Sequence, residues 1–267
     1  MKNNKYKILL LSDLNKSATS ELISTVSLAK MLDGDITLFH VKKPTDIVER
    51  ESQLSAMRSI NEEHILTNKT IENLIKPISQ DYQLNIGFDV AIGNIKHEIE
   101  AYIKNYQPDI IVLGKRKPKT INFMGDNITD YVLKTHKGSI MIAAQNQSLQ
   151  PNQDAMLGVL NTSDQAVDTN FIKELISKTN QPIKAFKIVS QLAPTQTVVD
   201  NKTIEYVFEK GDNAVDNVSK YALKSNINLM CFDNAKQQNS NTNIKNVISK
   251  LNVSLLLTGQ QSTILHK

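Results

Sequence analysis

Short apolar runs rich in Ile, Leu and Val alternate with longer amphipathic or polar segments along the first 145 residues of the chain. Such runs are typical of strands buried on both faces, and an apolar side chain every three or four positions is typical of helices. Strands are predicted at residues 7–12, 36–41, 84–90, 109–113 and 139–144, and helices at 20–32, 45–76 and 95–106, with a fourth ending near residue 137. This alternation predicts a parallel sheet with right-handed crossovers and helices on both faces.

The same pattern starts again after a polar segment. Residues 145–153, QNQSLQPNQ, carry one apolar side chain, Leu149, which is the composition of a linker. Strands are then predicted at 157–160, 183–189, 204–209, 228–232 and 253–258, and helices at 168–178, 214–224 and 244–251, with an irregular loop at 191–202 where the first half has its long helix. We therefore predict an α/β protein of two tandem, doubly wound, parallel five-stranded sheets, with domains at residues 1–146 and 154–267, the second shortened and degenerate.

Composition narrows the class of protein. Hydrophobic residues make up 40% of the chain and charged residues 22%, as in ordinary soluble domains. The single cysteine, Cys231, excludes an intramolecular disulfide and fits a reducing compartment, and its apolar surroundings predict a buried thiol. No apolar run has the length of a signal peptide or a membrane span, so we expect a cytoplasmic protein. The net charge of +4, spread along the chain, is too small to indicate a nucleic-acid partner.

A basic, glycine-punctuated loop follows the predicted strand 109–113. Gly114 breaks the strand, residues 115–119 read KRKPK, and Gly125 precedes Asp126 and Asn127, either of which can cap the next helix. Free N–H groups and the helix dipole favour an anion at such a position. The loop is therefore a candidate phosphate site.

Several residues in combination resemble the universal stress protein family, and the doubling resembles its tandem form. A first strand ends in Asp13 (KILLLSD), His40 and Val41 close the second strand, Gly114 closes the fourth, and the half ends in ITDYVLKTHKGSIMIA. The resemblance covers residues 5–145 well and 155–259 in pattern. It implies the Rossmann-like, adenine nucleotide alpha hydrolase-like sandwich. It also implies ATP across the carboxyl ends of the strands, with Asp13 at the adenine or ribose edge and Val41 beside the base.

The phosphate motif of the family, G-x2-G-x9-G-[S/T], is only partly present. Gly114 matches its first glycine, Lys117 stands at the second, and Gly125 is the candidate third after a stretch two residues short. Lysine lacks the positive-φ freedom of glycine, although its ammonium attracts phosphate. Asp126 replaces a hydroxyl donor, and at an effective dielectric of about 20 its charge roughly 4 Å from a phosphate charge costs about 4 kcal/mol. A bridging Mg²⁺ would reverse that sign, and a helix cap needs no ligand at all.

These departures leave three alternatives open. The site binds ATP or another adenine nucleotide, with or without Mg²⁺; it binds a different anion; or it binds no ligand. The candidate nucleotide-binding residues are Asp13, Val41, Gly114, Lys117, Gly125, Asp126 and Asn127. The corresponding loop of the second half, residues 233–243, has no glycine and predicts no second site. The resemblance instead implies that residues 140–144 and 253–258 meet across a pseudo-twofold axis, an intramolecular pseudo-dimer that covers two sheet edges.

No catalytic constellation is evident. The five histidines form no metal-ligand pair, and no G-x-S-x-G, P-loop or S-G-G-x-D-S motif occurs. We therefore expect a stress-response binding and signalling module with at most one nucleotide site, no catalytic residues and no metal ligands. Two alternatives stay open: a slow ATP hydrolase of the same fold that uses Asp13, Asp126 and Asn127, and a protein-interaction scaffold that has lost its ligand. A homodimer of whole chains and an unidentified protein partner also stay open, and no membrane partner is expected.

Overall fold

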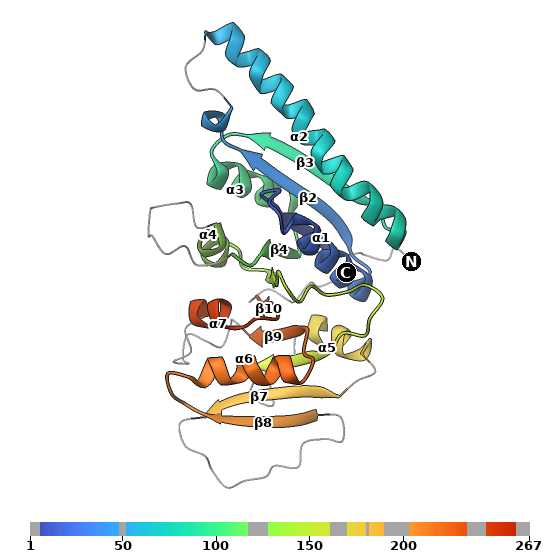
Figure 1. The fold of residues 1–267 in the computed structure, drawn as a ribbon, viewed down its shortest axis with the longest axis vertical. Coiled ribbons are helices and arrows are strands. Elements are labelled where there is room, and N and C mark those ends of the chain that lie inside the picture. Colours follow the sequence, from blue (N-terminus) through green and yellow to red (C-terminus); the bar gives the residue numbers. More distant parts are fainter. Residues whose placement is uncertain are drawn as a thin grey trace.

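The computed structural model describes residues 6–47, 52–116, 128–160, 170–179, 182–189, 203–233 and 244–259 of the chain. The strands are β1 (Lys7–Leu11), β2 (Asp35–Lys42), β3 (Ile86–Ile92), β4 (Ile110–Gly114), β5 (Ser139–Ala143), β6 (Leu157–Leu160), β7 (Ile183–Val189), β8 (Thr203–Glu209), β9 (Leu229–Asp233) and β10 (Ser254–Thr258). The helices are α1 (Ala18–Leu32), α2 (Gln53–Tyr82), α3 (Ile95–Tyr106), α4 (Ile128–Thr135), α5 (Asn170–Ser177), α6 (Ala214–Lys224) and α7 (Ile244–Lys250), with a 3₁₀ turn at Pro44–Asp46. This order confirms the predicted α/β class (Figure 1).

The ten strands in the described ranges belong to one continuous sheet, in the order β3-β2-β1-β4-β5-β10-β9-β6-β7-β8. Within each half the strands are parallel, and the halves join where β5 pairs antiparallel with β10, Met141 opposite Leu256. The predicted meeting of residues 140–144 and 253–258 is thus confirmed. The two predicted five-stranded sheets are units of a single sheet, because the antiparallel pairing satisfies the edge that each would otherwise expose.

Helices cover both faces of this sheet, and each face buries one apolar cluster that runs through both halves. On one face α1, α2 and α5 contribute side chains such as Leu22, Ile71 and Leu175. On the other, α3, α4, α6 and α7 contribute Ile99, Val132, Val218 and Val247. Among the described helices, none combines the length and the apolar composition needed to cross a bilayer.

The segment between the halves packs against the core. Leu149 is 1% exposed, and its N–H donates to Ser24 Oγ of α1 at 3.1 Å. The two halves are also in direct contact here, because the Tyr6 hydroxyl, just before β1, donates to Glu174 of α5 at 3.0 Å. Residues 145–153 therefore have the composition of a linker but form a polar segment that is held on the surface of α1.

The helix α2 continues past its predicted end. The sequence predicted a helix over residues 45–76, yet α2 includes Pro77 and ends at Tyr82. A proline inside a helix removes one hydrogen bond and crowds the preceding turn. The last turn persists because Ile78 is buried at 5% exposure and Tyr82 packs on the same cluster.

The second half has charged side chains where the first half packs α2. Lys187 of β7 and Glu205 of β8 form an ion pair at 2.9 Å, and both lie on the face that carries α5. An apolar helix over this pair would bury two charges, which is unfavourable. The irregular loop predicted at 191–202 lies outside the described residues.

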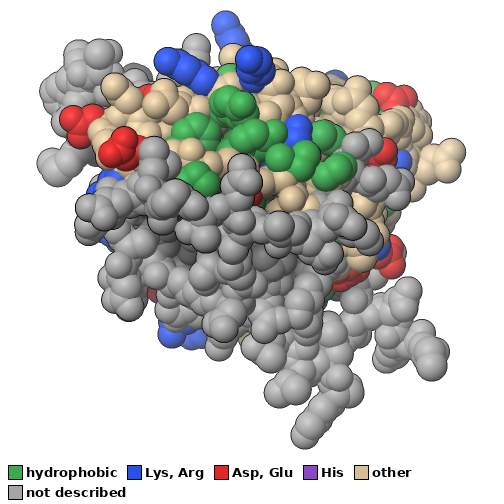
Figure 2. All heavy atoms as spheres, turned by 90° about the horizontal axis from the view of Figure 1, so that it is seen from below, with side chains coloured by type: hydrophobic (Ala, Val, Ile, Leu, Met, Phe, Trp, Pro, Cys, Tyr) green, Lys and Arg blue, Asp and Glu red, His purple; other side chains and the backbone are tan. Residues whose placement is uncertain are grey.

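The strand β8 forms the outer edge of the second half. Figure 2 looks onto this end of the sheet from below and shows apolar side chains gathered over it. The exposed large apolar residues here are Ile204, Val207 and Tyr221. Tyr221 of α6 contacts Tyr206 and Phe208, so part of this surface is an aromatic cluster shared by β8 and α6.

Candidate functional site

The strand register brings three of the predicted site residues to one edge of the sheet. Leu11 of β1 lies opposite Phe39 of β2 and opposite Leu113 of β4. Asp13, Val41 and Gly114 follow these positions by one or two residues, at the carboxyl ends of the strands. The connections from β1 and β4 leave on opposite faces here, through α1 on one side and α4 on the other. Such a switch point is where open α/β sheets bind ligands.

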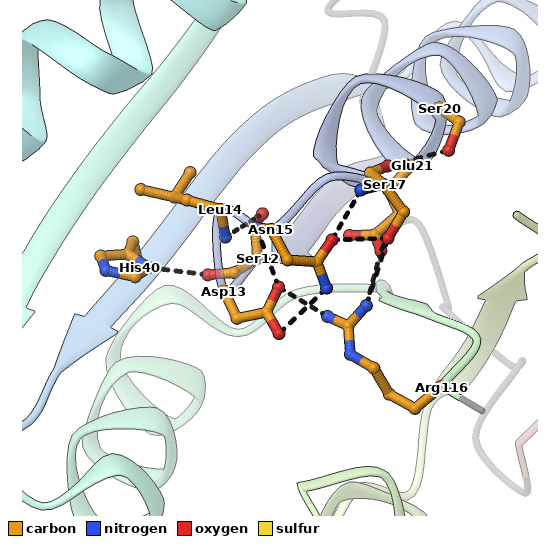
Figure 3. Close-up of polar contacts among 9 residues, drawn as sticks. All are labelled: Ser12, Asp13, Leu14, Asn15, Ser17, Ser20, Glu21, His40 and Arg116. Atoms are coloured by element: carbon orange, nitrogen blue, oxygen red, sulfur yellow. Dashed lines mark hydrogen bonds and ion pairs between the residues drawn. The ribbon is translucent and has the colours of Figure 1, made fainter. Parts of the chain in front are cut away.

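Arg116 joins the loop after β4 to the loop after β1. Its Nη2 lies 2.9 Å from Asp13 Oδ1, and its Nη1 lies 2.8 Å from Glu21 Oε1 of α1 (Figure 3). The guanidinium is 38% exposed and Asp13 is 54% exposed, so their pair lies at the protein surface. An arginine with one buried and one solvated carboxylate partner can exchange the solvated partner for another anion.

Glu21 is the buried partner of Arg116. Its side chain is fully buried, and its Oε1 also lies 2.6 Å from the Ser17 hydroxyl. Its Oε2 has no hydrogen-bond partner among the residues that the structure describes. A buried carboxylate is stable only when it is paired. Arg116 therefore stabilises the buried charge of Glu21 in addition to pairing with Asp13 at the surface.

Gly114 makes room for this carboxylate. A Cβ at position 114 would lie 1.9 Å from Glu21 Oε1. No glycine in the described ranges has a positive φ, so Gly114 does not use the backbone freedom expected of the first glycine in a phosphate motif. Glycine is therefore needed at position 114 for a steric reason, because the Glu21 side chain occupies the space beside its Cα.

The loop after β1 is ordered by its own side chains. Asp13 Oδ1 accepts from the Asn15 N–H at 3.3 Å, and Asp13 Oδ2 accepts from Asn15 Nδ2 at 3.2 Å. Asn15 Oδ1 in turn accepts from the Ser17 N–H at 2.7 Å, at the start of α1. These contacts hold the Asp13 carboxylate beside Arg116 and turn it toward the sheet edge.

His40 lies beneath this loop and has a structural role, as expected for a histidine at a strand end. It is 8% exposed, and its Nδ1 lies 2.8 Å from the Ser12 carbonyl oxygen. Burial lowers its pKa below the usual 6.5, and the hydrogen bond to Ser12 opposes that shift only in part. The neutral ring therefore donates to Ser12 and fixes the loop that carries Asp13.

The shifted pKa of His40 predicts a pH effect. In the unfolded chain this histidine titrates near 6.5, so the unfolded state takes up a proton that the folded state does not. Stability should fall as the pH drops from about 6.5 toward the lowered pKa of the folded state.

Urea unfolding at pH 7.5 and 5.5 should show a smaller loss of unfolding free energy on acidification for His40→Asn than for the wild type. His97→Gln, at a side chain that is 78% exposed, is the control and should behave as the wild type. Burial lowers the pKa of His136 to about 4, so some acid sensitivity remains in both variants. Equal losses in all three proteins would contradict the assignment.

Lys115 points away from this network and into the second half. Its ammonium donates to the carbonyl oxygens of Ser249, at 3.1 Å, and of Leu251, at the carboxyl end of α7. Burial lowers the pKa of Lys115. Two consecutive residues after β4 therefore contact different halves of the molecule.

An open depression of about 660 Å³ lies beside the network, between the first turns of α1 and the segment after β5. Its lining includes Asn15, Ser17, Ser20 and Gln145. Its lining also includes Lys16 and Ile23, so the walls combine hydroxyl, amide, charged and apolar groups. Asp13, Val41 and Gly114 are not among its lining residues.

Comparison with known proteins identifies the fold. A model of the universal stress protein family matches residues 6–143. The chain belongs to the universal stress protein family. A universal stress protein from Archaeoglobus fulgidus DSM 4304 superposes with a TM-score of 0.68 at 12% identity, covering 95% of this chain and 98% of that one. A putative universal stress protein from Pseudomonas aeruginosa UCBPP-PA14 gives a TM-score of 0.53 at 10% identity, covering 96% of this chain and 93% of that one. At these identities the likeness shows the shared fold, which extends over both halves. No curated protein matches the sequence.

Four of the candidate residues of this universal stress protein lie outside the described residues: Lys117, Gly125, Asp126 and Asn127. Two residues that the sequence analysis did not select, Arg116 and Glu21, form the centre of the network. One feature of the sequence could have indicated Glu21: it shares a helix face with the apolar residues Leu28 and Leu32. An acidic residue in that register predicts a buried carboxylate that needs a cationic partner.

No metal site is evident in the described part of this universal stress protein, which contains no group of three or more His, Cys, Asp or Glu residues placed to hold an ion. Both carboxylate oxygens of Asp13 already accept hydrogen bonds.

Proposed function

We propose that this universal stress protein binds an adenine nucleotide in its first half, at the carboxyl ends of β1, β2 and β4, and acts as a stress-response binding and signalling module. The observation that carries the proposal is the solvated ion pair of Arg116 and Asp13 at the switch point of the sheet. It supports the proposal because a guanidinium, which can bind phosphate, and a carboxylate, which can accept from ribose hydroxyls, lie side by side where open α/β sheets bind ligands.

Exchange of partners at Arg116 supports this function. A phosphate oxygen near Nη2 would replace Asp13, while Nη1 would stay on Glu21 and keep that buried charge paired. The released Asp13 carboxylate would then accept hydrogen bonds from ribose hydroxyls. Val41, partly buried against the cluster that contains Phe39, offers an apolar wall for the base.

The charge of the network predicts which nucleotide form binds. Asp13 and Glu21 carry two negative charges against the one positive charge of Arg116. Two like charges about 4 Å apart cost roughly 4 kcal/mol at an effective dielectric of about 20, so bare ATP is disfavoured. Mg²⁺ on the phosphates removes much of this repulsion. We therefore expect ATP to bind more tightly with Mg²⁺ than without it, and AMP to depend less on the ion.

In this proposal the protein binds its nucleotide and has no dedicated catalytic activity. The described side chains at the switch point are engaged in ion pairs and turn hydrogen bonds, an arrangement suited to holding a ligand. A second candidate function is a protein-interaction scaffold without a ligand. The favouring observation is that both terminal nitrogens of the Arg116 guanidinium are paired with carboxylates of the chain itself.

The test is mass spectrometry of small molecules released from the natively purified protein, together with calorimetry using ATP, ADP, AMP and adenosine at zero and millimolar Mg²⁺. Arg116→Lys keeps a charge beside Glu21 but loses the two-pronged contact. It should weaken Mg-ATP binding about tenfold, the effect of roughly 1.4 kcal/mol, and leave adenosine binding nearly unchanged.

The matched control is Arg58→Lys, the same change at an exposed position on α2. Release of inorganic phosphate, followed in the same samples, would reveal slow ATP hydrolysis. If the purified protein carries no nucleotide and no heat of binding appears with any of the four ligands at millimolar concentration, the nucleotide proposal is wrong and the scaffold function is supported.

A further inference from the structure

The region around α7 places the second half of the chain in direct contact with the nucleotide-site loop of the first half. Lys115 contacts the carboxyl end of α7 through the carbonyl oxygens of Ser249 and Leu251. Near the other end of the same helix, Lys245 Nζ lies 2.5 Å from Asp130 Oδ2 of α4. Figure 1 shows α7 lying next to α4 across the junction of the two halves.

Both contacts are made by residues of the first half that follow β4. Lys115 immediately precedes Arg116 in the chain, and α4 is the next helix after β4. One helix of the second half is therefore bonded to the residue beside Arg116 and to the first described helix that follows it. The junction below them is rigid, because β5 pairs with β10 and the Ala144 N–H donates to Ser254 Oγ at 3.1 Å in a buried position.

The chemistry of the Lys115 contact suits a positioning role. The last carbonyl groups of a helix have no partner within the helix and carry its negative dipole end, so an ammonium there is favourable. The contact is partly buried, which strengthens it and shields it from salt. Since Lys115 and Arg116 are adjacent, a fixed Lys115 limits the positions that the Arg116 backbone can adopt.

We propose that the second half completes the nucleotide site of the first: α7 holds Lys115 as a positioning residue for Arg116, so nucleotide binding and the local stability of α7 are coupled. This inference rests on the proposed function. It gives the second half, whose own loop lacks glycine, a role in ligand binding. By linkage, a protein partner that engages α7 would change nucleotide affinity by the same factor as the nucleotide changes affinity for that partner.

The test uses the full chain and two readouts with Mg-ATP. Calorimetry should show Lys115→Met binding about tenfold more weakly than the wild type, a typical coupling between linked sites, and Lys115→Arg restoring most of the affinity. Hydrogen exchange should show that Mg-ATP protects the amides of residues 247–252 in the wild type and not in Lys115→Met. A residue that merely stabilised the fold would not alter this ligand-dependent protection.

The control is Lys250→Met, the same substitution at a lysine of α7 whose ammonium instead contacts the Asp212 carbonyl oxygen and the Asp216 carboxylate within the second half. It should leave nucleotide affinity unchanged. If the wild type binds Mg-ATP but Lys115→Met binds equally well and α7 exchange ignores the ligand, this inference alone is wrong. If the wild type binds no nucleotide at all, the proposed function fails and the inference fails with it.

Discussion

Replacing Gly259 by alanine should open the junction between the two halves and lower the free energy of unfolding by about 3 kcal/mol or more. Gly259 directly follows β10. A Cβ there would lie 2.0 Å from the carbonyl oxygen of Lys137 and 2.4 Å from that of Gly138. Both atoms belong to the backbone that leads into β5, so no side-chain rotation relieves the overlap. The strands must move apart, which removes the antiparallel pairing that joins the sheet.

Urea unfolding followed by circular dichroism measures this effect. Gly211→Ala is the control, because nothing lies within 4 Å of a Cβ at that position and its midpoint should stay within error of the wild type. Since each apolar cluster runs through both halves, the wild type should unfold in one transition and Gly259→Ala earlier, with two separable steps. An unchanged midpoint for Gly259→Ala would show that the junction is looser than described.

Gly114→Ala should destabilise the protein by about 3 kcal/mol through a different mechanism. The added methyl group displaces the Glu21 carboxylate, which then loses its contacts with Arg116 and the Ser17 hydroxyl while still buried. Glu21→Ala in the same chain removes the obstructed group. The double variant should therefore be more stable than the sum of the single effects predicts, by about 1–3 kcal/mol.

The double-mutant cycle uses chemical unfolding of all four proteins. Gly87→Ala in β3 is the matched control, because a Cβ there meets only ordinary contacts, the nearest at 3.6 Å from Thr37 Oγ1. It should change stability by less than about 1 kcal/mol. Additive effects of Gly114→Ala and Glu21→Ala would show that the two residues do not compete for the same space.

The sequence predicted the fold well where the signal is local. Every described strand begins and ends within about two residues of a predicted apolar run, because buried parallel strands are recognisable as uninterrupted runs of Ile, Leu and Val. The pairing of the last strands of each half followed from the family resemblance. The continuation of α2 through Pro77 could not be predicted, because it depends on the packing of Ile78 against the sheet.

The site was predicted less well than the fold, for a physical reason. The register of parallel strands places Asp13, Val41 and Gly114 at one edge, and the order of elements alone predicts that. The ion pairs of Arg116 join residues about a hundred positions apart and depend on side-chain directions. The sequence motif directed attention to glycines as phosphate-contacting residues, whereas Gly114 is adjacent to a buried carboxylate that no motif contains.

The antiparallel pairing of β5 with β10 also has a consequence for folding during synthesis of the chain. β5 is fully buried in the finished protein, yet its partner β10 lies at the far end of the second half. At about 5–20 residues per second, a ribosome takes roughly 6–20 s to synthesise the intervening chain. During that time a folded first half presents the apolar strand SIMIA, paired with β4 on one side and with no strand on its outer edge. Two nascent first halves can pair through that edge, so correct assembly depends on the second half emerging and folding before neighbouring chains on the same messenger RNA meet.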